Sequence, residues 1–410
     1  MAHTIIAALD VGSSTIQTVI AEQRRGENSL HVLGVGVAAS AGVRRGVIVN
    51  IDDATAAIRQ SVAEAVQASG VPLRSVWLAV GDAHVTVSSS RGVVAVSRAD
   101  QEISPEDVRR AIAAAETFIP KNANKEILHI IPRDFRVDNE SGVKDPVGMH
   151  GVRLEVDTLI IECSTPFLKN LLKCVDGAGL KVEDYIFSPY AAAEVALTKR
   201  QKELGVMLVD IGGSTSSFMV FEEGVPIHAG VVPIGGSHIT NDVAIGFRTH
   251  IDIAEQIKLV HASCLPDAIP RKEQIKLADF VPESPSSHNR RELAEIVEAR
   301  LQDLFELLQK ELKKIDRTRL LPAGVVLVGG SSLLPGLVEL TREELGLPVE
   351  LGRLEHAPIA DESMALSLIP VFGVLQWASH RSEQPGSMWS PRLSRLNTNK
   401  VSKWLKSLLP

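Results

Sequence analysis

The sequence has little cysteine, no long hydrophobic run and no excess of positive charge. Its three cysteines show no spacing typical of a metal site, so we expect free thiols in the core and a reducing compartment. No run of about 18 apolar residues could span a membrane, and the nearest one, Ala365–Leu375, contains a proline and a glycine. A net charge of −7 argues against a nucleic-acid-binding protein.

The sequence does have enough apolar material for a large core. Of its 410 residues, 45% are hydrophobic and 23% are charged, as in a globular protein of two or more domains. The apolar run Ile5–Leu9 meets an aspartate too early for a secretion signal. We therefore expect a cytosolic body.

Two short segments, Ala8–Thr15 and Leu208–Thr215, repeat one pattern. In each, an apolar strand ends at an aspartate, a turn of small residues follows, and a second apolar strand begins. Glycine and serine in such a turn let backbone N–H groups cradle a phosphate. An aspartate tolerates the nearby phosphate when Mg²⁺ lies between them, held through the carboxylate and water.

The repeated pattern predicts that two hairpins grip one nucleotide between two domains, with Mg²⁺ near Asp10 and Asp210. The alternative is an ordinary tight turn. The Gly-Gly pair after Asp210 disfavours that alternative there, because glycine weakens strands. The candidate phosphate-contacting residues are Asp10, Gly12, Ser13, Ser14, Thr15, Asp210, Gly212, Gly213, Ser214 and Thr215.

Two weaker elements follow the second hairpin. Gly329, Gly330 and Ser331 come directly after an apolar strand, and such a turn can approach the adenine ring or a phosphate. Glu255 and Lys258 are three positions apart, so a helix would present both on one face. They could hold the ribose hydroxyls, but spacing alone favours a surface ion pair.

Other stretches indicate how the chain is organised. The segment 84–162 reads as an inserted α+β unit, with a helix that Ser104 caps. We predict one helix at Pro189–Arg200, a loop over Leu265–Asn289, and a helix starting near Leu334. A long helix at Arg290–Lys314, a core helix at Asp361–Trp377 and a flexible linker at Ser379–Thr398 complete the predicted elements.

Residues 399–410 combine an apolar stripe at helical spacing with lysines beside it. This composition is typical of an amphipathic helix that lies in a membrane interface. The alternative is a helix that docks on its own domain or on a partner. The residues that carry the pattern are Lys400, Val401, Lys403, Trp404, Leu405, Lys406, Leu408 and Leu409.

The four nucleotide-site elements, in this order, resemble the motifs of the actin-like ATPase superfamily. The segments Gly42–Asp52, Ile234–Gly246 and Ala254–Lys258 narrow the resemblance to the FtsA family of bacterial cell-division proteins. The resemblance implies an α/β, actin-like two-domain ATPase fold with duplicated ribonuclease-H-like cores. It also implies an inserted α+β subdomain, called 1C, and a C-terminal amphipathic helix.

The resemblance implies boundaries for each subdomain. The expected order is subdomain 1A at 1–83, subdomain 1C at 84–162, a return to 1A at 163–200, subdomain 2A at 201–234, subdomain 2B at 235–320, 2A with a return to 1A at 321–378, a linker at 379–398 and a membrane-targeting helix at 399–410.

The resemblance also implies a function. A member of this family binds ATP with Mg²⁺, and here Gly235, Gly236, Glu255 and Lys258 would join the site, the last two at the ribose. It polymerises at the division site on anionic lipids of the cytoplasmic face of the inner membrane. It tethers the FtsZ ring through the FtsZ C-terminal peptide, and it contacts other division proteins through 1C. Arg300 is our first choice for the peptide contact, although a solvated charged face is an equal reading.

The sequence departs from the family pattern in both loops. Thr15 stands where a lysine is usual, and Ser214 and Ser217 replace a glycine and an aspartate. Losing the lysine weakens stabilisation of transition-state charge, so we expect weak or absent ATP hydrolysis, and no residue stands out as catalytic. Two alternatives remain: an FtsA-like pilus-assembly protein, and a small-molecule kinase of the same superfamily.

Overall fold

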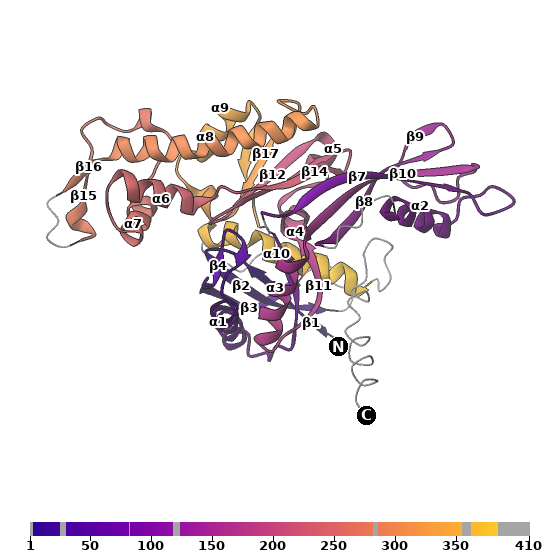
Figure 1. The fold of residues 1–410 in the computed structure, drawn as a ribbon, viewed down its shortest axis with the longest axis horizontal. Coiled ribbons are helices and arrows are strands. Elements are labelled where there is room, and N and C mark those ends of the chain that lie inside the picture. The colour runs from indigo at the N-terminus through magenta and orange to yellow at the C-terminus, as the bar shows by residue number, and fades with distance from the viewer. Residues whose placement is uncertain are drawn as a thin grey trace.

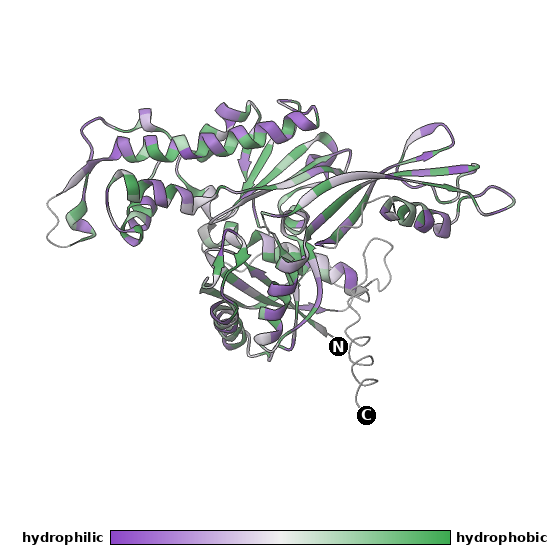
Figure 2. Ribbon diagram, in the orientation of Figure 1, coloured by the Kyte–Doolittle hydropathy of each residue, from purple (hydrophilic) through white to green (hydrophobic). Residues whose placement is uncertain are grey.

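The computed structural model describes residues 3–24, 30–81, 83–117, 124–281, 286–354 and 362–383. Within these residues, two five-stranded sheets form two domains, and a four-stranded sheet projects from the first domain (Figure 1). Hydrophobic residues concentrate on the strands of the sheets, whereas the long helix α8 alternates between hydrophobic and hydrophilic faces (Figure 2). No helix in the described ranges is long and apolar enough to cross a membrane.

The first domain is built on a sheet with the strand order β11-β6-β1-β2-β3. Three strands form an antiparallel meander, and two later strands add parallel to β1. Helices α1 and α3 cover one face, and α4 and α10 pack on the other. The elements are β1 (His3–Val11), β2 (Thr15–Arg24), β3 (Leu30–Ala39), α1 (Ile51–Ser69), β6 (Ser75–Val80), α3 (Thr165–Gly177), β11 (Lys181–Phe187), α4 (Ser188–Ala196) and α10 (Glu362–Glu383).

The second domain repeats this topology, with the strand order β14-β13-β12-β17-β18. Its first strand again pairs antiparallel with the second strand and parallel with a later one. The duplicated core predicted from the sequence is therefore confirmed. The elements are α5 (Lys199–Leu204), β12 (Val206–Ile211), β13 (Ser216–Glu222), β14 (Val225–Val232), β17 (Val325–Val328), α9 (Leu337–Leu345) and β18 (Val349–Leu351).

The inserted unit is an α+β layer whose strands run in the order β7-β10-β8-β9. Helix α2 packs on this sheet, and Ser104 caps it by accepting a hydrogen bond from the Asp107 N–H at 3.3 Å, as predicted. The unit extends away from the two central sheets (Figure 1). Its elements are β7 (Thr86–Ala95), α2 (Pro105–Thr117), β8 (Lys125–Val137), β9 (Glu140–Val143) and β10 (Arg153–Ser164).

A helical region extends from the second domain on the opposite side (Figure 1). The segment Leu265–Asn289, predicted as a loop, contains a small two-stranded hairpin, because Gln274 to Lys276 pair with Ser287 to Asn289. The elements are α6 (Gly236–Gly246), α7 (Ile251–His261), η1 (Pro266–Ala268), β15 (Gln274–Lys276), η2 (Leu277–Asp279), β16 (Ser287–Asn289) and α8 (Arg290–Lys314).

Two predicted helices have different bounds in the structure. The helix predicted at Pro189–Arg200 is two helices, because Thr198 starts a new one. Its hydroxyl accepts the Gln201 N–H at 3.2 Å, and the Gln201 side chain accepts the Thr198 N–H at 2.8 Å. The helix predicted from Leu334 begins at Leu337, after a short 3-10 turn named η3 (Gly330–Leu333).

Helix α10 is longer than predicted and takes in the first residues of the predicted linker. Ser379 is 3% exposed, and Arg381 pairs with Asp184, so packing holds this end of the helix to the first domain. The rest of the predicted linker, and the whole predicted helix 399–410, lie outside the described residues.

Helices α4 and α10 lie between the two domains and cross each other closely. A Cβ on Gly373 of α10 would collide with the backbone of Ala191 in α4, so only glycine permits this crossing. Residues of α4 also pack against β12 and β13 in one core that the two domains share. The three cysteines are free and buried, as predicted.

Candidate functional site

The two predicted phosphate loops have the same backbone hydrogen bond. The Gly12 N–H donates to the Thr15 oxygen at 3.1 Å, and the Gly212 N–H donates to the Thr215 oxygen at 3.0 Å. The aspartates also hold the same place, since each is one residue short of its strand's end. Local sequence therefore gives both hairpins one geometry.

The two loops meet at one cavity of about 780 Å³ between the domains. A Cβ on Gly213 would fall on the Ser14 side chain, so the loops are nearly in contact. Of the nucleotide-site residues predicted from the sequence, all but Gly235 line this cavity. Gly235 supports the second loop instead, because a Cβ there would press on the backbone of Gly212 and Gly213.

The second loop rests on the start of α6. The Gly236 N–H donates to the Gly212 oxygen at 3.0 Å, and the Ser237 N–H donates to the Gly213 oxygen at 2.6 Å. The Ser331 hydroxyl also donates to the Gly212 oxygen, at 3.2 Å. These contacts bring the predicted adenine-side turn and the phosphate loop into one rigid wall.

Glu255 and Lys258, for which spacing alone favoured a surface pair and the family resemblance implied ribose contacts, both line the cavity. The pair does form, with 2.7 Å between the Lys258 ammonium and a Glu255 carboxylate oxygen. However, Lys258 is buried, and its ammonium also donates to the Thr240 hydroxyl at 2.9 Å. The surface interpretation is therefore wrong for Lys258, since packing of α7 on α6 encloses it.

The chemistry of the cavity fits a divalent cation. Burial raises the pKa of Asp10 to about 6. Burial and the charge of Asp10 together raise the pKa of Asp210 to about 7. The buried Gln17 side-chain oxygen has no hydrogen-bond partner among the described residues. Those residues include no cluster of three or more metal-ligating side chains, so a Mg²⁺ ion here would need phosphate oxygens and water as well.

Sequence reasoning missed part of the cavity lining. Gln17 pairs across the sheet with Asp10, so the hairpin register could have indicated it. Ser367 and Pro370 of α10 also line the cavity, but they lie far from both loops in sequence, and no local signal points to them.

Arg300, the predicted partner contact, lies on α8 and does not line the cavity. Its guanidinium donates twice to the Asp242 carboxylate, at 2.6 and 3.0 Å, and once to Asp303 at 3.0 Å. The predicted membrane residues lie outside the described residues.

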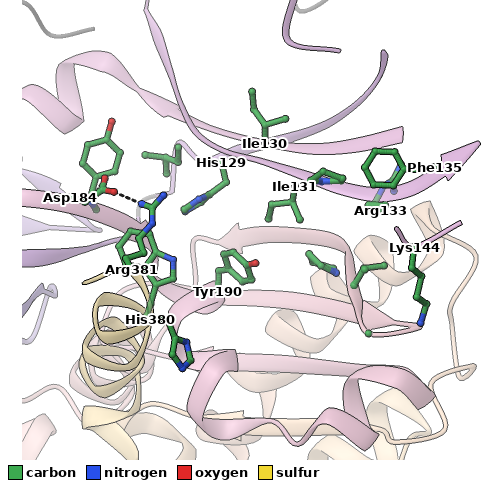
Figure 3. Close-up of a pocket in the computed structure, with 17 residues that line it drawn as sticks. His129, Ile130, Ile131, Arg133, Phe135, Lys144, Asp184, Tyr190, His380 and Arg381 are labelled. Atoms are coloured by element: carbon green, nitrogen blue, oxygen red, sulfur yellow. Dashed lines mark hydrogen bonds and ion pairs between the residues drawn. The ribbon is translucent and has the colours of Figure 1, made fainter. Parts of the chain in front are cut away.

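A second cavity of about 510 Å³ lies where the inserted unit, the first domain and β14 meet (Figure 3). Its walls include Ile131 and Phe135 of β8 and Tyr190 of α4. Asp184 and Arg381 form an ion pair at one end of it, and the Arg381 guanidinium lies 4.6 Å from the centre of the Trp377 ring.

Two cations at the other end of this cavity reach the second domain (Figure 3). Arg133 donates to the Ile227 oxygen at 3.3 Å, and Lys144 donates to the Glu223 oxygen at 2.8 Å. With Arg381, which is paired with Asp184, these side chains give the cavity a cationic rim around an apolar floor. The sequence analysis did not predict this cavity.

Comparisons with known proteins agree with the fold and the insertion. A family model described as cell division protein FtsA matches residues 207–368, and one described as the SHS2 domain inserted in FTSA matches residues 82–162. The cell division protein FtsA of Pseudomonas aeruginosa is 38% identical over 85% of this chain and 82% of its own length. The cell division protein FtsA of Bacillus subtilis is 33% identical over 94% of this chain and 86% of its own length.

Solved structures show the actin-like fold. The PilM-PilN type IV pilus biogenesis complex aligns with a TM-score of 0.65 at 17% identity, covering 90% of this chain and 97% of that chain. MreB5 of Spiroplasma citri bound to ADP aligns with a TM-score of 0.54 at 12% identity, covering 93% of this chain and 99% of that chain. At these identities the likeness concerns the fold alone.

Proposed function

Because the chain belongs to the FtsA family of bacterial cell-division proteins, we propose that it is an ATP-binding actin-like protein that polymerises on the inner membrane. It lies on the cytoplasmic face at the division site, tethers the FtsZ ring and recruits later division proteins. The observation that carries this proposal is that both phosphate loops line one cavity, with Gly213 against Ser14.

In the proposed complex, the N–H groups of both turns hold the phosphates of ATP. Asp10 and Asp210 hold Mg²⁺ through water, and Mg²⁺ supplies the positive charge that lets carboxylates and phosphates share the site. Glu255 and Lys258 lie where they could accept and donate hydrogen bonds to the ribose hydroxyls. The glycine turn at Gly329 approaches the adenine side.

Replacing Asp210 tests the nucleotide site. Asp210→Ala should weaken binding of a fluorescent ATP analogue with Mg²⁺ by at least about tenfold, because the metal loses a carboxylate. Glu306→Ala, which removes an exposed carboxylate of the same domain, is the matched control and should change nothing. Undiminished affinity in the Asp210 variant would remove the basis of the proposal.

We propose that ATP hydrolysis is slow or absent. Thr15, Ser214 and Ser217 give the loops neutral side chains, and the ammonium of Lys258 is already paired with Glu255. The two loops themselves then offer no positively charged side chain to stabilise the transition state. Phosphate release at a rate typical of an efficient ATPase would contradict this.

Membrane attachment is proposed to depend on assembly. Each large side chain of the 399–410 helix gains roughly 1.5–3 kcal/mol on burial, and each lysine adds about 1 kcal/mol near anionic lipid. Ordering the helix costs roughly 1 kcal/mol per residue, so one copy binds weakly. A polymer presents many copies and gains avidity.

A liposome assay tests the coupling between assembly and attachment. Attachment to anionic vesicles should rise steeply with protein concentration and should be lost when residues 398–410 are removed. Tight attachment that does not depend on protein concentration would contradict the coupling, and attachment of the shortened chain would contradict the role of the helix.

We propose that the C-terminal peptide of FtsZ docks on the helical region of the second domain, with Arg300 as a contact. Two hydrogen bonds to Asp242 hold the Arg300 guanidinium in place. An acidic group of the peptide would therefore replace Asp303 as the second partner of that guanidinium. Arg300→Ala should weaken peptide binding in a titration, and Lys310→Ala, on the same helix, is the control. Equal effects of the two variants would indicate a general attraction of charge.

We also propose that the second cavity receives a segment of a later division protein. Its apolar floor and cationic rim fit a short peptide with apolar side chains and an acidic group. Ile131→Trp should fill the cavity and stop recruitment of later division proteins to an intact FtsZ ring, which fluorescence microscopy can measure. Normal recruitment would contradict this assignment.

A further inference from the structure

The nucleotide cavity has an unbalanced charge. Of the described residues that line it, Lys258 alone is positively charged, against the carboxylates of Asp10, Asp210 and Glu255. The Lys258 ammonium is bound by Glu255 at 2.7 Å and lies on the α7 side of the cavity. A nucleoside triphosphate keeps a net negative charge even with Mg²⁺ bound, so a further cation near the phosphate loops would strengthen its binding.

A small hairpin of the first domain reaches this region. Strands β4 (Val43–Arg44) and β5 (Val47–Ile48) pair, and Arg45 and Gly46 form the turn between them. The Gly46 N–H donates to the Ser13 hydroxyl at 2.8 Å, and Gly46 lines the cavity. The tip of the hairpin is therefore fixed to the first phosphate loop.

Arg45 has a backbone conformation that its residue type disfavours. Its φ is 51° and that of Gly46 is 75°, the pattern of a type I′ turn. Such a turn favours asparagine, aspartate or glycine at its first central position, and a long side chain there is strained. Strain of this kind is tolerated where the side chain has a use.

Arg45 is next to Gly46, which lines the cavity, and its guanidinium has no ion-pair partner among the described residues. Burial lowers the pKa of His238, at the start of α6, and the positive charges of Arg300 and Arg45 lower it further. Arg45 of the first domain is therefore within electrostatic range of the second domain. The neighbouring Arg44 is also unpaired within the described ranges but does not act on His238.

We propose that Arg45 contacts the terminal phosphate of the bound nucleotide, supplying the positive charge that the cavity lining lacks. The inference rests on the proposed nucleotide site. A guanidinium binds phosphate oxygens through two parallel hydrogen bonds. Because Gly46 is hydrogen-bonded to Ser13, the tip of the hairpin is fixed to the first phosphate loop, and the backbone of Arg45 is one residue away from the cavity lining.

Arg45→Gly is the decisive variant, because glycine adopts the same turn without strain and the fold should be retained. The affinities for fluorescent ATP and ADP are measured with Mg²⁺. The variant should lose at least about tenfold in ATP affinity, as expected for a lost charged hydrogen bond, while ADP affinity stays within about twofold. Arg44→Ala removes an equal charge one residue away and should leave the ATP-to-ADP ratio unchanged.

The outcomes separate this inference from the function on which it rests. An unchanged ATP-to-ADP ratio in Arg45→Gly would overturn it, and so would an equal shift in Arg44→Ala, which would indicate diffuse charge. Equal losses for ATP and ADP would also overturn it, because they would mean that Arg45 bridges the domains and does not contact the terminal phosphate. A wild-type chain that binds neither nucleotide would overturn the proposed function itself.

Discussion

The two cavities of this molecule are built in opposite ways. The proposed nucleotide cavity forms where two turns with one hydrogen-bond pattern meet, and its lining is largely backbone and small side chains. The second cavity has no repeated motif, and its apolar floor and cationic rim come from β8, α4, β14 and the end of α10. The cavity between the duplicated domains is therefore lined by residues of recognisable local motifs. The cavity beside the inserted subdomain is lined by residues that lie far apart in the sequence and share no motif.

If the cavities are separate units, damage to the second one should lower stability and spare nucleotide binding. Arg381→Ala leaves the Asp184 carboxylate, which is 20% exposed, without its ion pair. Burial already raises the pKa of Asp184. The free energy of unfolding should fall by about 3 kcal/mol, measured by chemical denaturation, while ATP affinity stays unchanged.

The matched control for Arg381 removes both charges. Asp184→Asn combined with Arg381→Met should recover most of the lost stability, because no unpaired charge is left in the wall of the cavity. A fall in ATP affinity in either variant would mean that the two cavities are coupled and that the comparison fails.

Acid should weaken the second cavity through His129. Burial, with a smaller effect of the Arg381 charge, lowers the pKa of His129 from 6.5 to about 3, and its ring nitrogen accepts the Phe187 N–H at 2.9 Å. Between pH 6.5 and about pH 3, His129 is therefore protonated in the unfolded chain and neutral in the folded chain. The stability that His129 contributes is complete above pH 6.5 and is lost as pH falls, by roughly 2 kcal/mol at pH 5.

Chemical denaturation curves recorded from pH 8 to pH 5 measure how steeply the free energy of unfolding falls with pH. Gln at position 129 can still accept the Phe187 N–H but does not titrate, so His129→Gln should be less steeply acid-sensitive than the wild type. The same slope in both proteins would show that His129 is not the group responsible.

The smallest expected effect concerns the contact between the twin loops. Gly213→Ala places a Cβ on Ser14 and should weaken ATP binding roughly tenfold, because overpacking pushes the loops apart. Combining it with Ser14→Gly should restore most of the affinity. A Gly213→Ala protein with full affinity would show that the loops need not approach this closely in the bound state.

The sequence analysis was most successful where the signal was local. The loops at Asp10 and Asp210 both line one cavity, and a family model for an inserted domain matches residues 82–162, where the sequence predicted an inserted unit at 84–162. It failed where a contact joins distant segments. The start of the predicted linker is helical, because Arg381 reaches Asp184, nearly 200 positions earlier, and no periodicity in 379–383 reveals that pairing.

By itself, the sequence determined the hairpins, because an aspartate, a small-residue turn and two apolar strands fix a local backbone geometry with few alternatives. Only the tertiary structure decided that the hairpins face each other, that Lys258 is enclosed and that Gly46 is bound to Ser13 in the cavity lining. The close crossing of α10 over α4 at Gly373 helps to set those placements. Such packing depends on shape complementarity between elements far apart in the chain, which residue patterns do not encode locally.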